Sequence, residues 1–411
     1  MPTGAPFVTL STQDAPRARA GARTRRPMNF VNFRGESRAL ALYIHWPFCV
    51  SKCPYCDFNS HVRSRIDQQE WREALLADLA HESRLLPGKK LTSIFFGGGT
   101  PSLMEPATVA ALVETARSHW AASDDIEITL EANPNSVESA RFADLAAAGV
   151  NRLSLGLQSF DDSALRFLGR AHSAAEGLAA LDVAQKHFER VSFDLIYALP
   201  GDTEAGWSAT LDRALSLGTT HLSLYQLTIE PGTRFARMVA KREFEPLDSD
   251  MAAELFELTH ERTAAAGLPA YEISNHATPC HESRHNLTYW RYGDYAGIGP
   301  GAHGRRLGSR TVRHKKPENF LSALARNGHA IAEEALLTAR EAADEALVMG
   351  LRLAEGIDVD ALEQRFGVPL IDRRATQRLA VSGHLDVEAN RLTVPPAGRL
   401  VLDRILAEIA V

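Results

Sequence analysis

The chain has 411 residues, of which 45% are hydrophobic and 23% charged, and its formal net charge is −6. This composition is ordinary for a globular protein, and the negative balance excludes nucleic-acid binding driven by bulk electrostatics. No run of 18 apolar residues is present, so the sequence predicts no membrane-spanning helix.

The first 27 residues differ from the rest of the chain. They carry five arginines and one acidic residue, and their apolar residues show no periodicity. An Arg-rich, acid-poor segment is typical of an organellar transit peptide. The alternative, which we favour, is a disordered extension over residues 1–38, with Met28 as a plausible true start.

From residue 39 onward, six apolar segments alternate with helical patterns. The segments that predict helices are rich in Ala, Leu, Glu and Arg, with apolar residues three or four positions apart. They are 68–86, 105–120, 138–148, 173–188 and 204–217. Six strand-then-helix units in a row predict an α/β fold with a parallel sheet, either a partial barrel or a doubly wound sheet.

The pattern changes after residue 235. Residues 249–266 predict a helix, "PAYEISNHA" predicts a strand, and "HNLTYWRYGDYAGIGPGAHG" predicts a loop rich in aromatics and glycine. Residues 316–411 are predicted mostly helical, with a hairpin in "GHLDVEANRLTVPPAG" and a last helix at 397–410. We therefore divide the folded part into 39–235, 236–315 and a small winged-helix-like module, 316–411.

Three of the four cysteines lie within eight residues: Cys49, Cys53 and Cys56, spaced C-x3-C-x2-C. Four cysteines are too few for a disulfide framework in a chain of this length. The clustered three therefore indicate a metal site in a reducing compartment. A structural zinc site needs four ligands, and His45 or His61 could complete one. A [4Fe–4S] cluster normally takes four cysteines, so three would leave one iron open to an outside ligand. Three unligated thiols are the remaining alternative.

Polar or glycine residues end each of the predicted strands, where α/β folds gather their sites. They are Cys49 to Cys56, Gly97 to Thr100, Glu131, Gln158, Asp194 and Gln226. The glycine run would let a ligand approach the backbone closely. Glu131 could receive a ribose hydroxyl or an ammonium group, and Arg170 is a natural partner for a carboxylate.

The cysteine spacing, with an aromatic before the last cysteine, resembles the signature of radical S-adenosylmethionine (SAM) enzymes. The resemblance implies that the three thiolates hold a [4Fe–4S] cluster whose open iron binds SAM. One electron from the cluster would then cleave SAM to a 5′-deoxyadenosyl radical.

Further motifs are similar to the coproporphyrinogen III dehydrogenase-like branch of that family, over residues 40–410: "YIHWPFC", "CPYCDF", "FFGGGTPS", "EANP", "GLQSF", "LGRAH" and "DLIYALPG". The resemblance implies a partial (β/α)6 barrel in 39–235, a barrel-completing region in 236–315 and a C-terminal helical module. It also implies that SAM is contacted by Tyr43, Tyr55, Gly99, Thr100, Glu131, Gln158, Arg170 and Asp194.

Two kinds of protein share this architecture: the oxygen-independent dehydrogenase, and a chaperone that binds haem. The dehydrogenase type has a further cysteine where this chain has Phe58. The "HNLTYW" stretch fits the HNxxYW motif of the chaperone type, so we favour haem binding and expect no dehydrogenase activity. His285 would be the axial ligand, oriented by Asn286, while Tyr289 and Trp290 would contact the porphyrin.

Cys280 and His281 are alternative haem ligands, whereas His172, His276 and His303 are predicted either to be structural or to support ligand-binding residues from behind. The resemblance implies haem-accepting client proteins, membrane respiratory enzymes among them, and an electron donor for the cluster. It leaves a homodimer open, and we expect a cytoplasmic protein. The dehydrogenase activity, and a different radical SAM reaction such as methyl transfer, remain as alternatives.

Overall fold

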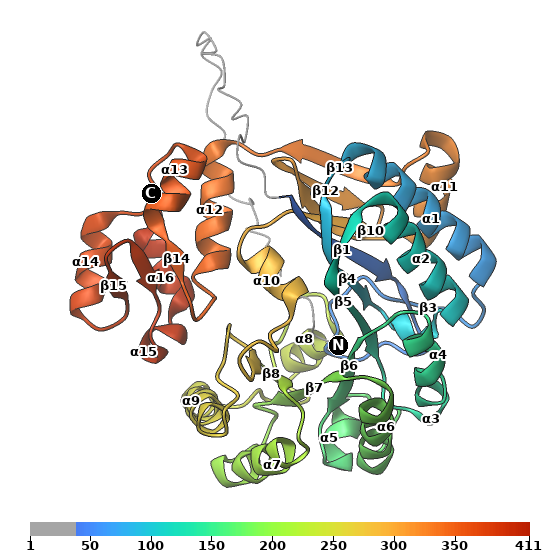
Figure 1. Cartoon of the computed structure of the whole chain (residues 1–411). Coiled ribbons are helices and arrows are strands. Elements are labelled where there is room, and N and C mark those ends of the chain that lie inside the picture. The colour runs from blue at the N-terminus through green and yellow to red at the C-terminus, as the bar shows by residue number, and fades with distance from the viewer. Residues whose placement is uncertain (1–37) are drawn as a thin grey trace.

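The computed structural model describes residues 38–411 (Figure 1). The predicted disordered extension, and the choice between extension and transit peptide, therefore lie outside the described residues. Within residues 38–411, no helix is long and apolar enough to cross a membrane.

Six parallel strands form the centre of the fold, and they pair in chain order. They are β1 (Ala39–Trp46), β4 (Lys90–Gly98), β5 (Ala121–Ala132), β6 (Arg152–Gln158), β7 (Arg190–Tyr197) and β8 (His221–Gln226). The connecting helices are α1 (Gln68–Leu85), α2 (Pro106–His119), α4 (Phe142–Ala147), α6 (Ala174–His187) and α7 (Glu204–Ser216). This arrangement confirms the predicted partial (β/α)6 barrel.

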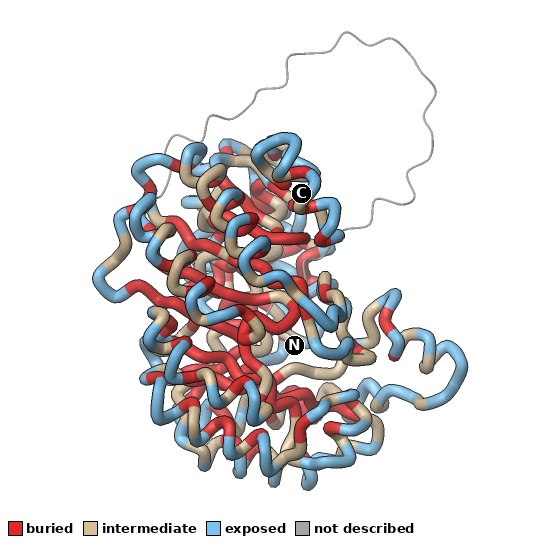
Figure 2. Tube along the Cα trace, turned by 90° about the vertical axis from the view of Figure 1, so that its right-hand side faces the viewer, coloured by how far each residue is buried: buried red, intermediate tan, exposed pale blue. Residues whose placement is uncertain are grey.

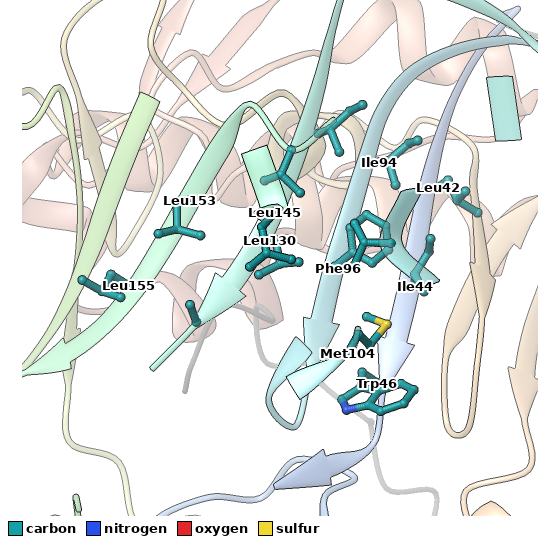
Figure 3. Packing of buried hydrophobic residues seen from close by; sticks show 14 of the residues in the cluster. Leu42, Ile44, Trp46, Ile94, Phe96, Met104, Leu130, Leu145, Leu153 and Leu155 are labelled. Atoms are coloured by element: carbon teal, nitrogen blue, oxygen red, sulfur yellow. The ribbon is translucent and has the colours of Figure 1, made fainter. Parts of the chain in front are cut away.

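The strands hold their positions because they are apolar on both faces, as expected for parallel strands covered by helices. Figure 2 shows the buried residues concentrated along the central strands, with exposed residues on the surrounding helices and loops. In Figure 3, Leu42 and Ile44 of β1 lie beside Ile94 and Phe96 of β4, and Trp46 lies near Met104. This continuous core fixes the strand ends that carry the predicted site.

The sheet extends beyond the six strands at both edges. Beside β8 lies β9 (Asn275–Ala277), which is antiparallel. On the other side β10 (Tyr295–Ile298) pairs parallel with β1, followed by antiparallel β11 (His303–Arg306), β12 (Ser309–Arg313) and β13 (Ile331–Leu336). Among the described residues this gives one sheet of eleven strands.

Residues 285–304, predicted as a loop, are mostly regular structure, and that prediction is wrong. They hold α10 (Arg284–Trp290), β10 and the start of β11. The predicted strand at 269–277 shortens to the three residues of β9, while α9 (Ser249–Ala265) forms as predicted. The loop prediction failed because helix α10 has only seven residues, too few to show an apolar period.

The C-terminal module has its own hydrophobic core, formed by residues from Leu337 to Ile409 with Tyr292. Its helices are α12 (Ala339–Gly350), α13 (Val359–Phe366), α14 (Arg373–Val381), α15 (Pro396–Arg399) and α16 (Leu402–Ile409). The predicted hairpin is present as β15 (Asp386–Glu388) and β16 (Arg391–Thr393), with β14 (Ile357–Asp358) as third strand. The result is a small, mostly helical module, as predicted.

The segment between Lys316 and Leu337 lies with the barrel rather than with the module's core. Helix α11 (Pro317–Asn327) contacts α1, and Phe320 stacks on Trp71 at 5.9 Å between ring centroids. Strand β13 continues the barrel's sheet. The domain boundaries at 235 and 315 stay predictions. The hydrophobic core of the module begins at Leu337, about twenty residues after the boundary at 315.

Candidate functional site

The three clustered cysteines lie on one loop and line one cavity. A short parallel pair, β2 (Phe48–Cys49) and β3 (His61–Val62), holds the two ends of the loop together. All three thiols are partly exposed, and they face a cavity of about 110 Å³ that is also lined by Gly98, Gly99, Thr100 and Arg170. Cys280 is exposed and does not line that cavity. The loop therefore presents three thiols, without a fourth, to a space beside the strand ends.

Hydrogen-bond donors approach the sulfur atoms of these thiols. Thr100 Oγ1 lies 3.5 Å from the Sγ of Cys49, and Arg170 Nη1 lies 3.5 Å from the Sγ of Cys53. Burial opposes ionisation of Cys53, but the charge and hydrogen bond of Arg170 outweigh it, and the Cys53 pKa falls below its ordinary value. Burial raises the pKa of the Cys49 thiol. Donors aimed at sulfur favour thiolate ligands, so the three cysteines fit an iron–sulfur cluster.

The two histidines considered as zinc ligands are already engaged elsewhere. His45 is buried, with one ring nitrogen 2.9 Å from the Tyr43 hydroxyl and the other 2.9 Å from the Asn59 carbonyl. His61 lies 3.3 Å from Oδ1 of Asn59, and neither imidazole lines the cysteine cavity. The structure therefore does not support a Cys3His zinc site on this loop.

The glycine run at the end of β4, Gly97 to Gly99, is required by close backbone packing. A Cβ at Gly98, where φ is +112°, would lie 2.7 Å from the His45 ring, and one at Gly99 would lie 2.6 Å from the Phe48 carbonyl oxygen. The amides of Gly99 and Thr100 donate to the carbonyls of Trp46 and Phe48. These two amides therefore fix the cysteine loop against the end of β4.

Four predicted SAM residues lie on four different strands of the barrel: Glu131, Gln158 and Asp194 are buried, and Tyr43 is half-buried. Gln158 has a positive φ of 70°, and neither its Oε1 nor its Nε2 has a hydrogen-bond partner within the described part of the chain. A buried amide without partners is costly unless a ligand satisfies it. Gln158 therefore fits the presence of a polar ligand in the barrel.

The two carboxylic acids of this group have strongly shifted pKa values. Burial, together with the nearby Asp194, raises the pKa of Glu131 to about 8, and burial raises the pKa of Asp194 to about 7. Acids that are poised near neutrality in a barrel interior are typical of a ligand site. A cationic ligand such as SAM would favour their ionised forms.

Arg170 lies beside the cluster loop, and most of the hydrogen-bond donors of its guanidinium are already used within the protein. Its Nη2 donates to Asn133 Oδ1 at 2.7 Å and to the Gly156 carbonyl at 3.0 Å, while its Nε has no partner within residues 38–411. Asn133 also donates to Thr100 at 3.2 Å and to Glu138 at 3.2 Å. Asn133 is a site residue that sequence reasoning missed, although it stands in the quoted "EANP" motif at the end of a strand.

Helix α10 carries the HNLTYW stretch into the barrel. Ser283 caps its first turn, and the buried carboxylate of Glu127 accepts from the backbone amides of Arg284 and His285. The helix contacts β4 on one side and α12 of the C-terminal module on the other, and Figure 1 shows it between them. The motif therefore lies where the barrel and the module meet.

The residues of this motif point to different places. The His285 imidazole is buried, stacks on Phe95 with ring centroids 4.9 Å apart, and has Nδ1 3.2 Å from Ser93 Oγ. Burial, with a smaller effect of Arg152, lowers its pKa to about 3, so the imidazole is neutral. His285 lines neither cavity, whereas Tyr289 and Trp290 line the larger one.

That larger cavity has a volume of about 620 Å³. Its wall begins at Tyr55, Cys56 and Phe58 of the cysteine loop, includes the ends of β7 and β8, and reaches Arg352 and Arg399 of the C-terminal module. Volumes of about 300–1,000 Å³ and aromatic walls are usual for small-molecule and cofactor sites. Cys56 lines both cavities, so the cluster loop forms part of the wall of each.

The structure places the predicted site residues in three groups, and one of them, formed by Tyr43, Glu131, Gln158 and Asp194, lines neither cavity. Gly99, Thr100 and Arg170 share the small cavity with the cysteines, and Tyr55 opens on the large one. His172 has Nε2 3.0 Å from the Leu157 carbonyl and also lines the small cavity, so its structural role stays a prediction. Cys280 and His281 line neither cavity. The module's arginines carried no recognisable motif, so the sequence offered no signal for them.

Two family models match this sequence. The radical SAM superfamily matches residues 43–214, and the HemN C-terminal domain matches residues 337–401. The first match covers the cysteine loop and the parallel strands from Tyr43 of β1 to the end of β7, and the second covers most of the C-terminal module.

Similar proteins span nearly the whole described chain. The mitochondrial radical S-adenosyl methionine domain-containing protein 1 of Bos taurus is 41% identical over 79% of this chain and 75% of its own length. The heme chaperone HemW of Haemophilus influenzae is 37% identical over 89% of this chain and 97% of its own length. The solved structure of coproporphyrinogen III oxidase (HemN) from Escherichia coli matches with a TM-score of 0.77 at 24% identity, covering 90% of each chain, which shows the shared fold. The chain belongs to the radical SAM superfamily, in the family that contains these HemW and mitochondrial relatives.

Proposed function

We propose that this protein is a haem chaperone, which binds haem and delivers it to haem-dependent proteins. The observation that carries the proposal is that α10 presents Tyr289 and Trp290 to the 620 Å³ cavity. Flat aromatic walls suit a porphyrin, which buries a large apolar surface. The relatives named heme chaperone HemW, at 34–41% identity, support the same function.

Membership of the superfamily implies a [4Fe–4S] cluster and SAM, and the residues fit both. We propose that Cys49, Cys53 and Cys56 hold the cluster. The proposed SAM contacts are Tyr43, Tyr55, Gly99, Thr100, Glu131, Gln158, Arg170 and Asp194. When bound, the cluster supplies one-electron reduction of SAM. The chain's own contribution is to fix the thiols between Thr100 and Arg170 and to offer a ligand the unpartnered amide of Gln158.

The axial-ligand role of His285 stays a prediction. Its neutral imidazole has the protonation state that iron ligation requires. Because the ring is packed on Phe95, ligation of a haem in the cavity requires α10 to shift. Loss of the His285 ring should therefore change the iron's spectrum, whereas loss of the Trp290 ring should weaken binding without changing the ligand.

The proposed partners are haem-accepting clients, membrane respiratory enzymes among them, and an electron donor for the cluster. A homodimer and a cytoplasmic location complete the proposal. The bovine relative is described as mitochondrial. Expression with and without residues 1–27, followed by cell fractionation, tests the location. The cytoplasmic location would be overturned if the full chain were imported into an organelle and the chain without residues 1–27 were not.

An anaerobic haem titration of the cluster-loaded protein tests the proposed function. We expect saturation at one haem per chain, a shifted Soret band in His285→Ala and roughly ten- to a hundredfold weaker binding in Trp290→Ala. The exposed Arg378→Gln serves as the control. Conversion of coproporphyrinogen III by the same preparation, without saturable haem binding, would overturn the chaperone function in favour of the dehydrogenase.

A further inference from the structure

Three arginines of the C-terminal module line the large cavity: Arg352, Arg399 and Arg404. Arg404 is exposed, whereas the other two are half-buried. Arg352 follows α12, and Arg399 is the last residue of α15. Both belong to the module with its own hydrophobic core, whereas Tyr55, Tyr225 and Tyr289 of the same cavity belong to the barrel region. The cavity therefore pairs an aromatic wall from the barrel with cations from the module.

The Arg399 guanidinium is poorly compensated. Its Nη1 is buried and has no hydrogen-bond partner within the part of the chain that the structure describes. Burial lowers the Arg399 pKa, and the field of Glu272 opposes that change only in part. A half-buried cation with an unused donor costs stability unless an anion satisfies it. This arrangement is expected of a site that awaits an anionic group.

Arg352 is held in place by hydrogen bonds, but its guanidinium remains available to bind a ligand carboxylate. Its side chain is 10% exposed, and its Nη1 donates to the Val348 carbonyl at 2.7 Å. Its Nη2 pairs with Asp403 at 3.1 Å, and that carboxylate is 88% exposed. An ion pair with so exposed an acid is worth at most about 1 kcal/mol, so a ligand carboxylate can replace it.

The buried acid of the cavity does not neutralise these arginines by direct contact. Glu272 accepts a hydrogen bond from the side chain of Asn275 and from backbone amides of its own loop. Burial raises the Glu272 pKa, which weakens its negative charge further. The nearby His260 is neutral, because burial and the charge of Arg399 lower its pKa to about 4.

We propose that Arg399 and Arg352 bind the propionate carboxylates of the tetrapyrrole while the aromatic wall contacts its ring. This inference rests on the proposed haem function and assigns the recognition of the ligand's carboxylates to the C-terminal module. An arginine fork matches a carboxylate geometrically and forms charge-assisted hydrogen bonds to it. The module thereby selects a tetrapyrrole that carries free carboxylates over one that is esterified.

Titrations of the full, cluster-loaded chain with haem and with haem dimethyl ester, in one detergent-containing buffer, test this assignment. The dimethyl ester keeps the ring and the iron but lacks both negative charges. We expect Arg399→Gln and Arg352→Gln each to weaken haem binding roughly tenfold to a hundredfold. Neither substitution should change the affinity for the ester, which should bind the parent protein as weakly as haem binds the double variant.

Arg378→Gln is the matched control, because this arginine is on the same module, is 64% exposed and lies outside the cavity. Equal affinity of the parent protein for haem and its ester would overturn the assignment. So would unchanged haem binding in Arg399→Gln and Arg352→Gln while Trp290→Ala loses it, a result that leaves the proposed function standing. Absence of saturable haem binding by the parent protein would instead overturn the proposed function, and the assignment with it.

Discussion

At the scale of single residues, the buried acids of the barrel make the ligand-free protein sensitive to pH. Glu131 and Asp194 have pKa values of about 8 and 7 in the fold, against 4.5 and 3.8 as ordinary values. Between the ordinary and the raised values the native state binds more protons than the unfolded state. The free energy of unfolding therefore falls as pH rises through this window.

Glu131→Gln removes one of these titrations while it keeps the shape of the side chain. Relative to the parent, the variant should gain stability as pH rises from about 5 to 8, with a slope of at most about 1.4 kcal/mol per pH unit. Urea unfolding of both ligand-free proteins across that range measures the difference. Parallel pH profiles for the two proteins would show that Glu131 does not titrate as its burial predicts.

A second group of buried charges serves the fold rather than the ligand site. Arg313 is fully buried and pairs with Asp78 and Glu82, both on α1 and also fully buried. Arg306 pairs with Glu82 at 2.7 Å. These contacts fasten α1 to the antiparallel strands that prolong the sheet.

Arg313→Leu should destabilise the protein by about 3–5 kcal/mol, because it leaves the Asp78 carboxylate buried without its cation. Arg373→Leu, which removes a 58% exposed arginine that pairs with Asp360 and Glu363 at the surface, should cost less than about 1 kcal/mol. Denaturant unfolding of the two variants and the parent compares them. Equal small losses would mean that the buried network contributes no net stability.

At the scale of elements, the sequence predicted the strands and helices whose apolar pattern is long and periodic. The six apolar strands and helices such as α1 and α6 were predictable because their spacing persists over many residues. Helix α10 was missed because its seven residues stand among glycines and aromatics, and only the cap at Ser283 could have indicated it. Strand β10 was missed because its partner β1 lies about 250 positions earlier in the chain.

The glycine turn after β4 controls the position of the cysteine loop. In Gly99→Ala the added Cβ would lie 2.6 Å from the Phe48 carbonyl, next to Cys49. The loop must move, so we expect less iron per chain after anaerobic reconstitution. Gly206→Ala on α7, whose nearest contact would be Thr203 Oγ1 at 3.2 Å, should keep its iron. Full iron content in Gly99→Ala would contradict the close-packing argument.

At the scale of the whole molecule, the cavity is built from segments that are far apart in the chain. Tyr55 comes from the cysteine loop, Tyr289 from α10 and Arg399 from the module. The cluster cysteines were predictable because their spacing is local and chemically distinctive. The arginines were not, because long-range contacts, such as the packing of α10 between β4 and α12, bring the module beside the barrel.

The central claim, that this protein transfers haem, is tested most directly by measuring transfer itself. Haem-loaded protein is added to membranes that carry an apo-form haem-dependent respiratory enzyme, with excess apomyoglobin present to trap free haem. The account predicts that enzyme activity is restored despite the trap, while an equal amount of free haem restores none. Restoration that disappears when the trap is added would show release of free haem and would contradict the chaperone function.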